Sequence, residues 1–388
     1  MARRIVVLGG GMVGGFMARA LARSGRFDVT LADRDAAALE RSARLAPLAT
    51  RQADLADPAA VAALAAAAAV VVGAVPGFLG YRTVEAVLRA GRSIVDISFF
   101  PEDPFDLDGL ARERGLTAVV DCGVMPGLGG MLGADLLRGL DRADALTILV
   151  GGLPLERRWP TEYKAPFSPI DVIEEYTRPA RFRDRGQIVT RPALSDPELV
   201  DLPGAGTLEA FNTDGLRTLL RTLDVPTMRE KTLRYPGHIE FMRRLRALGF
   251  FSEEPLNVGG AAIAPRDLTA RLLFEEWRLE RGTPEFTVLR VEAVGVAGGR
   301  PVVRRYDLLD RTDPATGDSS MSRTTGSPAV VATELLLDGE LRGPGVIAPE
   351  TLAQGDRPVF PVFLERLATC GIVPVRSEDL LAGDSGGR

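Results

Sequence analysis

Three glycines near the amino terminus have the types and spacing of a nucleotide-binding turn. Gly9, Gly11 and Gly14 directly follow the apolar run RIVVL, and an amphipathic stretch, FMARALARSG, comes next. In a G-x-G-x-x-G turn between a strand and a helix, the first glycine permits the tight turn and the second admits a pyrophosphate. The third lets helix and strand pack closely. The start of the helix then offers free N–H groups to the phosphates.

An aspartate ends the next apolar run. Asp33 closes FDVTLAD, where its carboxylate can accept hydrogen bonds from both hydroxyls of an adenosine ribose. A carboxylate at this place repels a 2′-phosphate, so we expect NAD rather than NADP as the cofactor. Arg34 could pair with the extra phosphate, which leaves NADP as the alternative. The other interpretation of the motif is a glycine-rich turn that holds no nucleotide.

A second group of reactive residues lies in EKTLRYPGH, residues 230–238. Of the 47 lysines and arginines only Lys164 and Lys231 are lysine, and His238 is the single histidine. Lysine can exchange protons near neutral pH when its surroundings lower its pKa, whereas arginine cannot. Lys231 is therefore a candidate proton acceptor, expected beside Arg234 and Asp214, with His238 as the next candidate. The alternative is that the two lysines remain by chance.

Alternating strands and helices must position the amino-terminal motif. We expect strands near 4–8, 27–33, 46–50, 70–74, 93–97 and 117–120, and helices near 16–25, 36–43, 58–67, 81–90 and 107–114. This alternation predicts an α/β fold with a doubly wound, Rossmann-type parallel sheet, which binds ligands at the carboxyl ends of its strands. The residues expected to contact the cofactor are Gly9, Gly11, Met12, Val13, Gly14, Asp33, Arg34, Asp54, Val75, Pro76, Asp96, Ser98 and Met125.

The pattern changes in the second half of the chain. Strand-like runs near 145–153 and 287–296 and a helix near 237–248 predict an α+β substrate and oligomerisation domain over residues 126–325. The nucleotide-binding domain is expected at 1–125, completed by about 326–388. We expect a turn-rich link over 315–328, a helix over 329–337, and disorder in the last dozen residues.

Composition excludes several classes of protein. The 388 residues carry a net charge of −5, with 46% hydrophobic and 26% charged residues, which is typical of a globular protein that binds no nucleic acid. Cys122 and Cys370 are far apart, so neither a disulfide scaffold nor a metal site is expected. The uncharged stretch 59–80 is rich in alanine and broken by Gly73, Pro76 and Gly77, so we expect no membrane span. With no signal-peptide pattern, a cytoplasmic location is expected.

Six longer motifs make the chain recognisable. They are GGGMVGGFMA at the start, AVPGFLGYRTVEA from 74, VVDCGVMPGLGG from 119, EYKAPFSPIDVIEEYTRPAR from 162, GTLEAFNTDGLRTLL from 206 and MREKTLRYPGHIEFM from 228. With them the chain resembles the saccharopine dehydrogenase-like family, and within it the lysine 6-dehydrogenases. The last three motifs lie outside the nucleotide-binding fold and therefore concern the substrate.

The resemblance implies NAD-dependent oxidative deamination of L-lysine at its ε-carbon, giving 2-aminoadipate 6-semialdehyde, ammonia and NADH. Arg234 is suited to a bidentate clamp on the substrate carboxylate. The ε-ammonium must lose a proton before hydride can leave, and Tyr235 or Asn212 could orient the attacking water. The catalytic candidates are Lys231, His238 and Tyr235, and the substrate-binding candidates are Arg234, Asn212, Thr213, Asp214, Lys164 and Thr232.

Alternatives remain for the function and for each residue. A sister activity is that of a saccharopine dehydrogenase or reductase, or a related carboxyamine-forming NAD(P) enzyme. A different class is a catalytically inactive dinucleotide-binding sensor. His238 could simply flank a helix, and residues 212–214 could form a turn or a helix cap. The expected partners are a small amino-acid substrate and a second copy of the chain in a homodimer.

Overall fold

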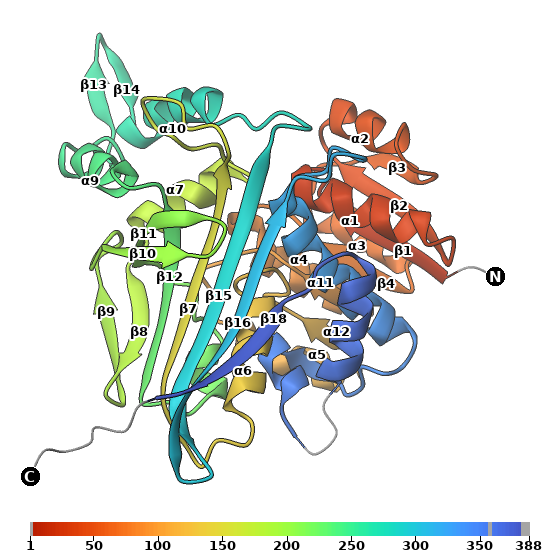
Figure 1. Cartoon of the computed structure of the whole chain (residues 1–388). Helices are drawn as coiled ribbons and strands as arrows, with labels where there is room; N and C mark the ends of the chain where they lie inside the picture. Colours follow the sequence, from red (N-terminus) through yellow and green to blue (C-terminus); the bar gives the residue numbers. More distant parts are fainter. Residues whose placement is uncertain (1–2, 356–358, 382–388) are drawn as a thin grey trace, which may run out of the picture. The chain divides into compact units, whose positions relative to one another are not determined.

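The computed structural model describes residues 3–355 and 359–381. The chain divides into two compact units (Figure 1). Unit 1 holds the described residues of Met1–Asp135 and Met321–Val373, and unit 2 holds those of Leu136–Ser320 and Pro374–Arg388.

Unit 1 is built on a seven-stranded parallel sheet. Its strands are β1 (Arg3–Leu8), β2 (Phe27–Asp33), β3 (Ala49–Gln52), β4 (Val70–Gly73), β5 (Ser93–Asp96), β6 (Thr117–Val119) and β17 (Gly345–Ile347). The order β17-β6-β5-β4-β1-β2-β3 reverses direction between β1 and β4. Such a reversal opens a crevice at the carboxyl ends of the two strands, where doubly wound sheets bind ligands. The predicted fold class is confirmed.

Helices accompany this sheet. They are α1 (Met12–Arg23), α2 (Ala36–Ala43), α3 (Pro58–Ala66), α4 (Gly77–Arg89), α5 (Asp108–Glu113), α6 (Leu128–Leu137), α11 (Ser320–Leu337) and α12 (Phe360–Thr369), with 3-10 turns at Pro104–Leu107 and Pro349–Ala353. Among the described residues no helix is long and apolar enough to cross a membrane.

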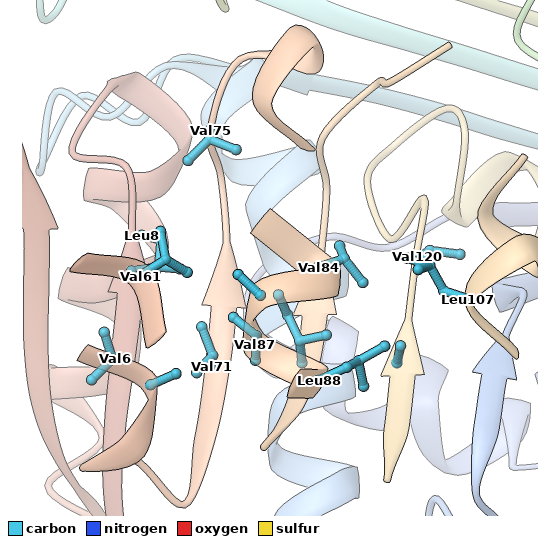
Figure 2. Packing of buried hydrophobic residues seen from close by; sticks show 14 of the residues in the cluster. Val6, Leu8, Val61, Val71, Val75, Val84, Val87, Leu88, Leu107 and Val120 are labelled. Carbon is cyan, nitrogen blue, oxygen red and sulfur yellow. The ribbon is translucent and has the colours of Figure 1, made fainter. Parts of the chain in front are cut away.

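Branched apolar side chains form the core of unit 1. Val6, Leu8 and Val71 from the strands pack with Val84 and Val87 of α4, and all are at most 2% exposed (Figure 2). Parallel strands covered by helices must be apolar on both faces, which explains continuous runs such as RIVVL and VVVG.

Unit 2 is built on a nine-stranded mixed sheet. Its strands are β7 (Arg142–Pro154), β8 (Ala180–Asp184), β9 (Gln187–Arg191), β10 (Glu198–Leu202), β11 (Gly206–Asn212), β12 (Thr227–Arg234), β15 (Glu285–Ala297), β16 (Arg300–Arg311) and β18 (Val375–Leu380). The main path runs β10-β11-β12-β7-β15-β16-β18, and β8 joins β12 to β9. The other elements are α7 (Pro169–Thr177), α8 (Leu219–Thr222), α9 (His238–Ala247), α10 (Pro265–Glu276) and the hairpin of β13 (Leu256–Val258) and β14 (Ala261–Ile263).

Several sequence predictions differ from the structure. Helices α1 and α4 begin earlier than expected, at Met12 and Gly77. The expected turn-rich link is partly wrong, because α11 already begins at Ser320 and contains Pro328. Its small polar residues, such as Ser322 and Thr324, are buried rather than exposed in turns. Disorder from residue 377 is also wrong as far as Leu380, because β18 pairs with β16; residues 382–388 lie outside the described part. Strand β3 begins at Ala49 rather than 46, since Pro47 has no N–H for a sheet ladder.

Candidate functional site

The glycine turn of unit 1 is shaped around its backbone. Gly9 has φ +106°, and a Cβ there would lie 2.3 Å from the carbonyl oxygen of Ala74. A Cβ on Gly14 would lie 2.0 Å from the carbonyl oxygen of Gly9. By contrast, a Cβ on Gly11 would meet nothing within 4 Å. Gly9 and Gly14 are therefore required by the fold, whereas the space beside Gly11 is open.

The first turn of α1 faces this open space without a side-chain cap. Gly11 occupies the N-cap position and, being a glycine, has no side chain that could cap the helix N-terminus. Met12 is partly exposed, and no acidic residue lies in the first turn. Uncapped N–H groups and the positive end of the helix dipole favour a phosphate ligand. The residues present thus fit a dinucleotide.

Asp33 lies at the carboxyl end of β2, beside the glycine turn. Its Oδ2 accepts a hydrogen bond from the Gly10 N–H at 2.5 Å, and its Oδ1 accepts one from the Asp35 N–H at 2.8 Å. These bonds fix the carboxylate beside the glycine turn, at the end of the second strand, where an acidic residue binds the adenosine ribose in folds of this type. The side chain of Arg34 is exposed, and its carbonyl oxygen accepts a bond from Gln52.

The other predicted cofactor contacts follow the ends of neighbouring strands. Asp54 is exposed and accepts a bond from the Ala56 N–H at 3.0 Å, so it shapes the turn before α3. Val75 and Pro76 lead from β4 into α4, where Pro76 is the N-cap. The carboxylate of Asp96 is fully buried and accepts bonds from both the N–H and the Oγ of Ser98.

The loop after β6 holds a buried thiol. Asp121 has φ +54°, and Cys122 donates its backbone N–H to the carbonyl oxygen of Asp96. Burial, aided by the charges of Asp121 and Asp96, raises the pKa of the Cys122 thiol well above its usual range. The thiol therefore stays neutral and cannot serve as a nucleophile. Met125 is half-buried in the same loop.

In unit 2, the segment 230–238 does not form one cluster. Glu230, Lys231, Thr232 and Arg234 all belong to β12, and successive side chains of a strand point to opposite faces of the sheet. Glu230, Thr232 and Arg234 therefore share one face, and Lys231 lies on the other. Proximity in the sequence suggested a single site, but strand geometry separates these residues.

Lys231 is buried within an ionic group on its own face. Its Nζ lies 2.6 Å from Glu198 Oε1 and donates to the carbonyl oxygen of Asp196 at 2.8 Å, while 3% of the side chain is exposed. Its neighbour on β11, Asn212, donates from Nδ2 to Ser195 Oγ and Asp196 Oδ2. These contacts tie the loop before β10 to the sheet.

Glu230 is a buried carboxyl on the opposite face. Its Oε2 accepts hydrogen bonds from Thr213 Oγ1 at 2.6 Å and from the Gly215 N–H at 3.0 Å. Thr213 also contacts the hydroxyl of Thr232 at 2.9 Å. Burial raises the pKa of Glu230 to about 8, and the bond from Thr213 only partly offsets this. A carboxyl titrating at this pH can act as an acid or a base near neutrality.

Arg234 is enclosed by aromatic rings. Its guanidinium carbon lies 4.3 Å from the ring centre of Tyr163 and 5.8 Å from that of Tyr176. Nη2 pairs with Glu175 Oε2 at 2.6 Å, Nε donates to the Tyr176 hydroxyl at 3.1 Å, and Nη1 donates to the carbonyl oxygen of Leu233 at 2.9 Å. With 2% of its surface exposed, this cation depends on Glu175 for its neutralisation.

A directed chain of hydrogen bonds leads from Arg234 to His238. The carbonyl oxygen of Thr161 lies 2.7 Å from His238 Nδ1 and can only accept, so Nδ1 carries the proton. Nε2 must then accept from the Tyr176 hydroxyl at 2.9 Å, while that hydroxyl accepts from Arg234. Burial and then the charge of Arg234 lower the pKa of His238 to about 3, so the ring is neutral at pH 7.

Three further predicted residues have partners of their own. The hydroxyl of Tyr235 donates to the carbonyl oxygen of Pro154 at 2.8 Å. Asp214 is buried and forms a bidentate pair with Arg181. The Nζ of Lys164 donates to the carbonyl oxygen of Glu276.

Sequence reasoning did not assign roles to the aromatic and acidic partners of Arg234. The motif EYKAPFSPIDVIEEYTRPAR contains Tyr163, Glu175 and Tyr176. This motif was the sequence feature that could have pointed to them. Trp277 packs edge-on against Tyr163 with 5.4 Å between ring centres. The Tyr163 hydroxyl and the Trp277 indole N–H are both buried without a hydrogen-bond partner in the described part of the chain. Buried polar groups normally have partners, so this cluster suits a polar ligand or water.

Comparison with known proteins assigns both units to one family. Residues 5–119 match the Saccharopine dehydrogenase NADP binding domain, and residues 123–372 match the Saccharopine dehydrogenase C-terminal domain. The saccharopine dehydrogenase (NADP(+), L-glutamate-forming) of Saccharomyces cerevisiae is 22% identical over 421 residues, which cover 90% of this chain and 94% of the yeast protein. The mitochondrial alpha-aminoadipic semialdehyde synthase of Mus musculus is also 22% identical, but this chain covers 47% of its length.

A solved structure shows the same fold. The apo histidine-tagged saccharopine dehydrogenase (L-Glu forming) from Saccharomyces cerevisiae superposes with a TM-score of 0.79 at 20% identity. The match covers 98% of this chain and 100% of the yeast chain.

Proposed function

Because both of its domains match, the chain belongs to the saccharopine dehydrogenase family, and we propose that it is a NAD-dependent dehydrogenase that oxidises L-lysine at the ε-carbon. One lysine, one NAD and one water would become 2-aminoadipate 6-semialdehyde, ammonium, NADH and one proton. The observation that carries this proposal is the glycine turn with its open space at Gly11 and its fixed carboxylate at Asp33.

The bound nicotinamide would accept hydride from the carbon that carries the nitrogen. Gly11 and the first turn of α1 would hold the pyrophosphate, and Asp33 would hold the adenosine ribose. We propose NAD as the cofactor because the carboxylate of Asp33 is anchored where a 2′-phosphate would lie. The relative from Saccharomyces cerevisiae is named for NADP, and the exposed Arg34 is the group that could favour the phosphate.

The substrate carboxylate would bind to Arg234. A guanidinium has five N–H groups, and the contacts of Arg234 use three of them. One N–H on each terminal nitrogen remains beyond these contacts, and these two donors could bind the oxygens of a substrate carboxylate. The buried indole N–H of Trp277 and the hydroxyl of Tyr163 supply further donors in the same aromatic cluster. This surplus of buried donors favours a group rich in acceptors.

The ε-ammonium must lose a proton before hydride transfer, and Glu230 suits this role better than Lys231. Glu230 shares its face of β12 with Arg234, whereas Lys231 lies on the opposite face and already contacts Glu198. Because burial raises the pKa of Glu230 to about 8, its carboxylate form appears at mildly alkaline pH. We therefore expect kcat/KM to rise through about pH 8.

Saccharopine is the second candidate substrate. It carries a glutamate moiety on the same nitrogen, so the bond oxidised would be equivalent. The names of the relatives favour it. Two further carboxylates would need a second cationic group, which the contacts of Arg234 alone do not supply.

One assay separates these candidates. The purified chain would be mixed with NAD or NADP and with lysine, ornithine or saccharopine, and the absorbance of reduced cofactor followed from pH 7 to 10. We expect turnover with NAD and lysine. Glu230→Gln should lower kcat by about 100-fold or more and remove its pH dependence, whereas Lys231→Met should retain most of kcat. Turnover with saccharopine alone would assign the second candidate, and no turnover with any pair would favour a nucleotide-binding sensor.

A further inference from the structure

Thr287 on β15 carries a buried hydroxyl that the structure leaves without a use. The side chain is fully buried, and its Oγ1 has no hydrogen-bond partner in the described part of the chain. The hydroxyl of Tyr163 and the indole N–H of Trp277 share this property, and both already belong to the proposed carboxylate site. A buried hydroxyl without a partner costs free energy, so such a group usually serves a ligand or a bound water.

The sheet register places Thr287 on the same face as Arg234. Thr232 of β12 pairs with Val150 of β7, and Gly152, two residues further along β7, pairs with Thr287 of β15. Paired residues point to the same face, and so do residues two apart along a strand. Arg234 and Thr287 therefore stand on either side of Gly152. Figure 1 shows β12, β7 and β15 side by side.

The opposite face of the sheet agrees with this placement. One buried apolar cluster there contains Leu233, Phe286 and Val288. Because side chains alternate along a strand, their neighbours Arg234 and Thr287 must point the other way. Adjacent strands lie about 4.8 Å apart, so roughly 10 Å separates the backbones of these two residues. Gly152 has no side chain, so the strand between them places none in this interval.

A carboxylate lies on the same face, next to Thr287. Glu285 precedes Thr287 by two residues on β15 and is 1% exposed. Its Oε1 accepts a hydrogen bond from the N–H of Ser320, whose Oγ accepts one from the Thr287 N–H at 3.1 Å. Burial raises the pKa of the Tyr163 hydroxyl; the charge of Arg234 opposes this rise and that of Glu285 adds to it. Glu285 therefore acts on the aromatic cluster that surrounds Arg234.

We propose that Thr287 and Glu285 bind the α-ammonium of an amino-acid substrate whose α-carboxylate binds Arg234. This assignment rests on the proposed function, in which Arg234 holds the carboxylate. A guanidinium and an indole N–H can only donate hydrogen bonds, which suits a carboxylate, whereas an ammonium needs acceptors such as a hydroxyl and a carboxylate. An α-amino acid carries both charged groups on one carbon, so its site must offer donors and acceptors side by side. Lysine and saccharopine share this head group.

The binding of L-lysine and of 6-aminohexanoate, which lacks only the α-amino group, tests the proposal. Isothermal titration would use the chain loaded with NADH, so that lysine binds without being oxidised. We expect lysine to bind about tenfold to 150-fold more tightly, the range for a hydrogen bond to a charged group. Thr287→Val should weaken lysine binding by a similar factor and leave 6-aminohexanoate unaffected. Glu285→Gln should also reduce the preference for lysine.

The position of the ligand can be read from Trp277. Trp159, the other tryptophan of the chain, is 87% exposed, so Trp159→Phe leaves Trp277 as the only indole fluorophore. We expect lysine to change the fluorescence of Trp277 in this variant. No change on binding would place the ligand elsewhere and overturn the proposal.

Thermal unfolding separates a ligand-binding hydroxyl from a structural one. Thr287→Val should not lower the melting temperature of the ligand-free chain, because the lost hydroxyl has no partner there. Thr269→Val is the matched control, since Thr269 is also buried but donates to the carbonyl oxygen of Phe250 at 2.8 Å. It should lower the melting temperature by roughly 1 °C or more and leave lysine binding unchanged.

The proposal and the proposed reaction can fail separately. Equal affinity for lysine and 6-aminohexanoate, or a loss of affinity in Thr287→Val that is the same for both, would overturn the role of Thr287 even if the native chain oxidises lysine. A preference for lysine that depends on Thr287, without NADH formation from NAD and lysine, would support the head-group site and refute the proposed reaction.

Discussion

Gly11→Ala should weaken dinucleotide binding without unfolding the chain. The backbone of Gly11, with φ −64° and ψ −167°, is accessible to alanine, and the added methyl would meet no atom within 4 Å. The methyl would instead occupy the space where the pyrophosphate approaches the start of α1. The fold should therefore tolerate a change that the ligand does not.

The size of the effect follows from the hydrogen bonds that would be lost. A hydrogen bond to a charged group contributes about 1.5–3 kcal/mol. Displacing the pyrophosphate from one backbone N–H should then weaken NAD binding by about tenfold to 150-fold, at 1.36 kcal/mol per tenfold. The free energy of unfolding should change by no more than about 1 kcal/mol, the usual cost of alanine at an N-cap.

Isothermal titration with NAD and thermal unfolding measure the two quantities separately. Gly109→Ala is the control, because Gly109 lies in α5 with open space around it and far along the chain from the turn. Gly14→Ala should behave in the opposite way and lose stability, because its methyl would overlap the carbonyl oxygen of Gly9. If Gly11→Ala bound NAD as tightly as the native chain, the nucleotide would not lie on this turn, and the reasoning would be refuted.

Three further predictions concern Asp33, Arg234 and the buried titratable groups. Asp33→Ala should shift preference from NAD toward NADP, because Arg34 remains; native protein that binds NADP more tightly than NAD in a titration would contradict this. Arg234→Lys keeps the positive charge but loses the paired N–H donors that bind a carboxylate bidentately. The kcat/KM for lysine should therefore fall by about tenfold to 150-fold. Unchanged kinetics in a folded variant would remove Arg234 from the site. Burial lowers the pKa of His238 from 6.5 to about 3, so below about pH 6.5 the histidine takes up a proton in the unfolded chain but not in the folded one. The stability that the neutral, buried ring provides should therefore be lost as pH falls from about 6.5 to 3. Burial raises the pKa of Glu230 from 4.5 to about 8, so its contribution should be lost as pH rises from about 4.5 to 8, by at most about 5 kcal/mol. Thermal unfolding across pH should show that Glu230→Gln removes the decline in stability between about pH 4.5 and 8. A decline unchanged in that variant would show that another group causes it.

The nucleotide-binding half could be predicted because its signals are local. Gly9, Gly14 and Asp33 belong to one strand–helix–strand unit, so their distances along the chain fix their distances in space. The errors arose where small polar residues act through packing. Small polar residues such as Ser322 and Thr324 are typical of turns, so the sequence predicted a turn-rich link. In the structure both residues are buried and belong to α11. Strand β18 was missed because its residues are exposed and its pairing with β16 joins distant parts of the sequence.

The sequence by itself determined the fold class, the glycine turn and the family, and it identified the segment that holds Arg234. Only the tertiary structure decided how that segment is divided. Strand alternation separates Lys231 from Glu230 and Arg234, although they are neighbours in the chain. Glu175 and Tyr176, which pair with Arg234, come from α7, more than 50 residues earlier. The Thr161 carbonyl fixes the tautomer of His238. Burial, which no linear pattern specifies, then sets which of these groups titrate near neutral pH.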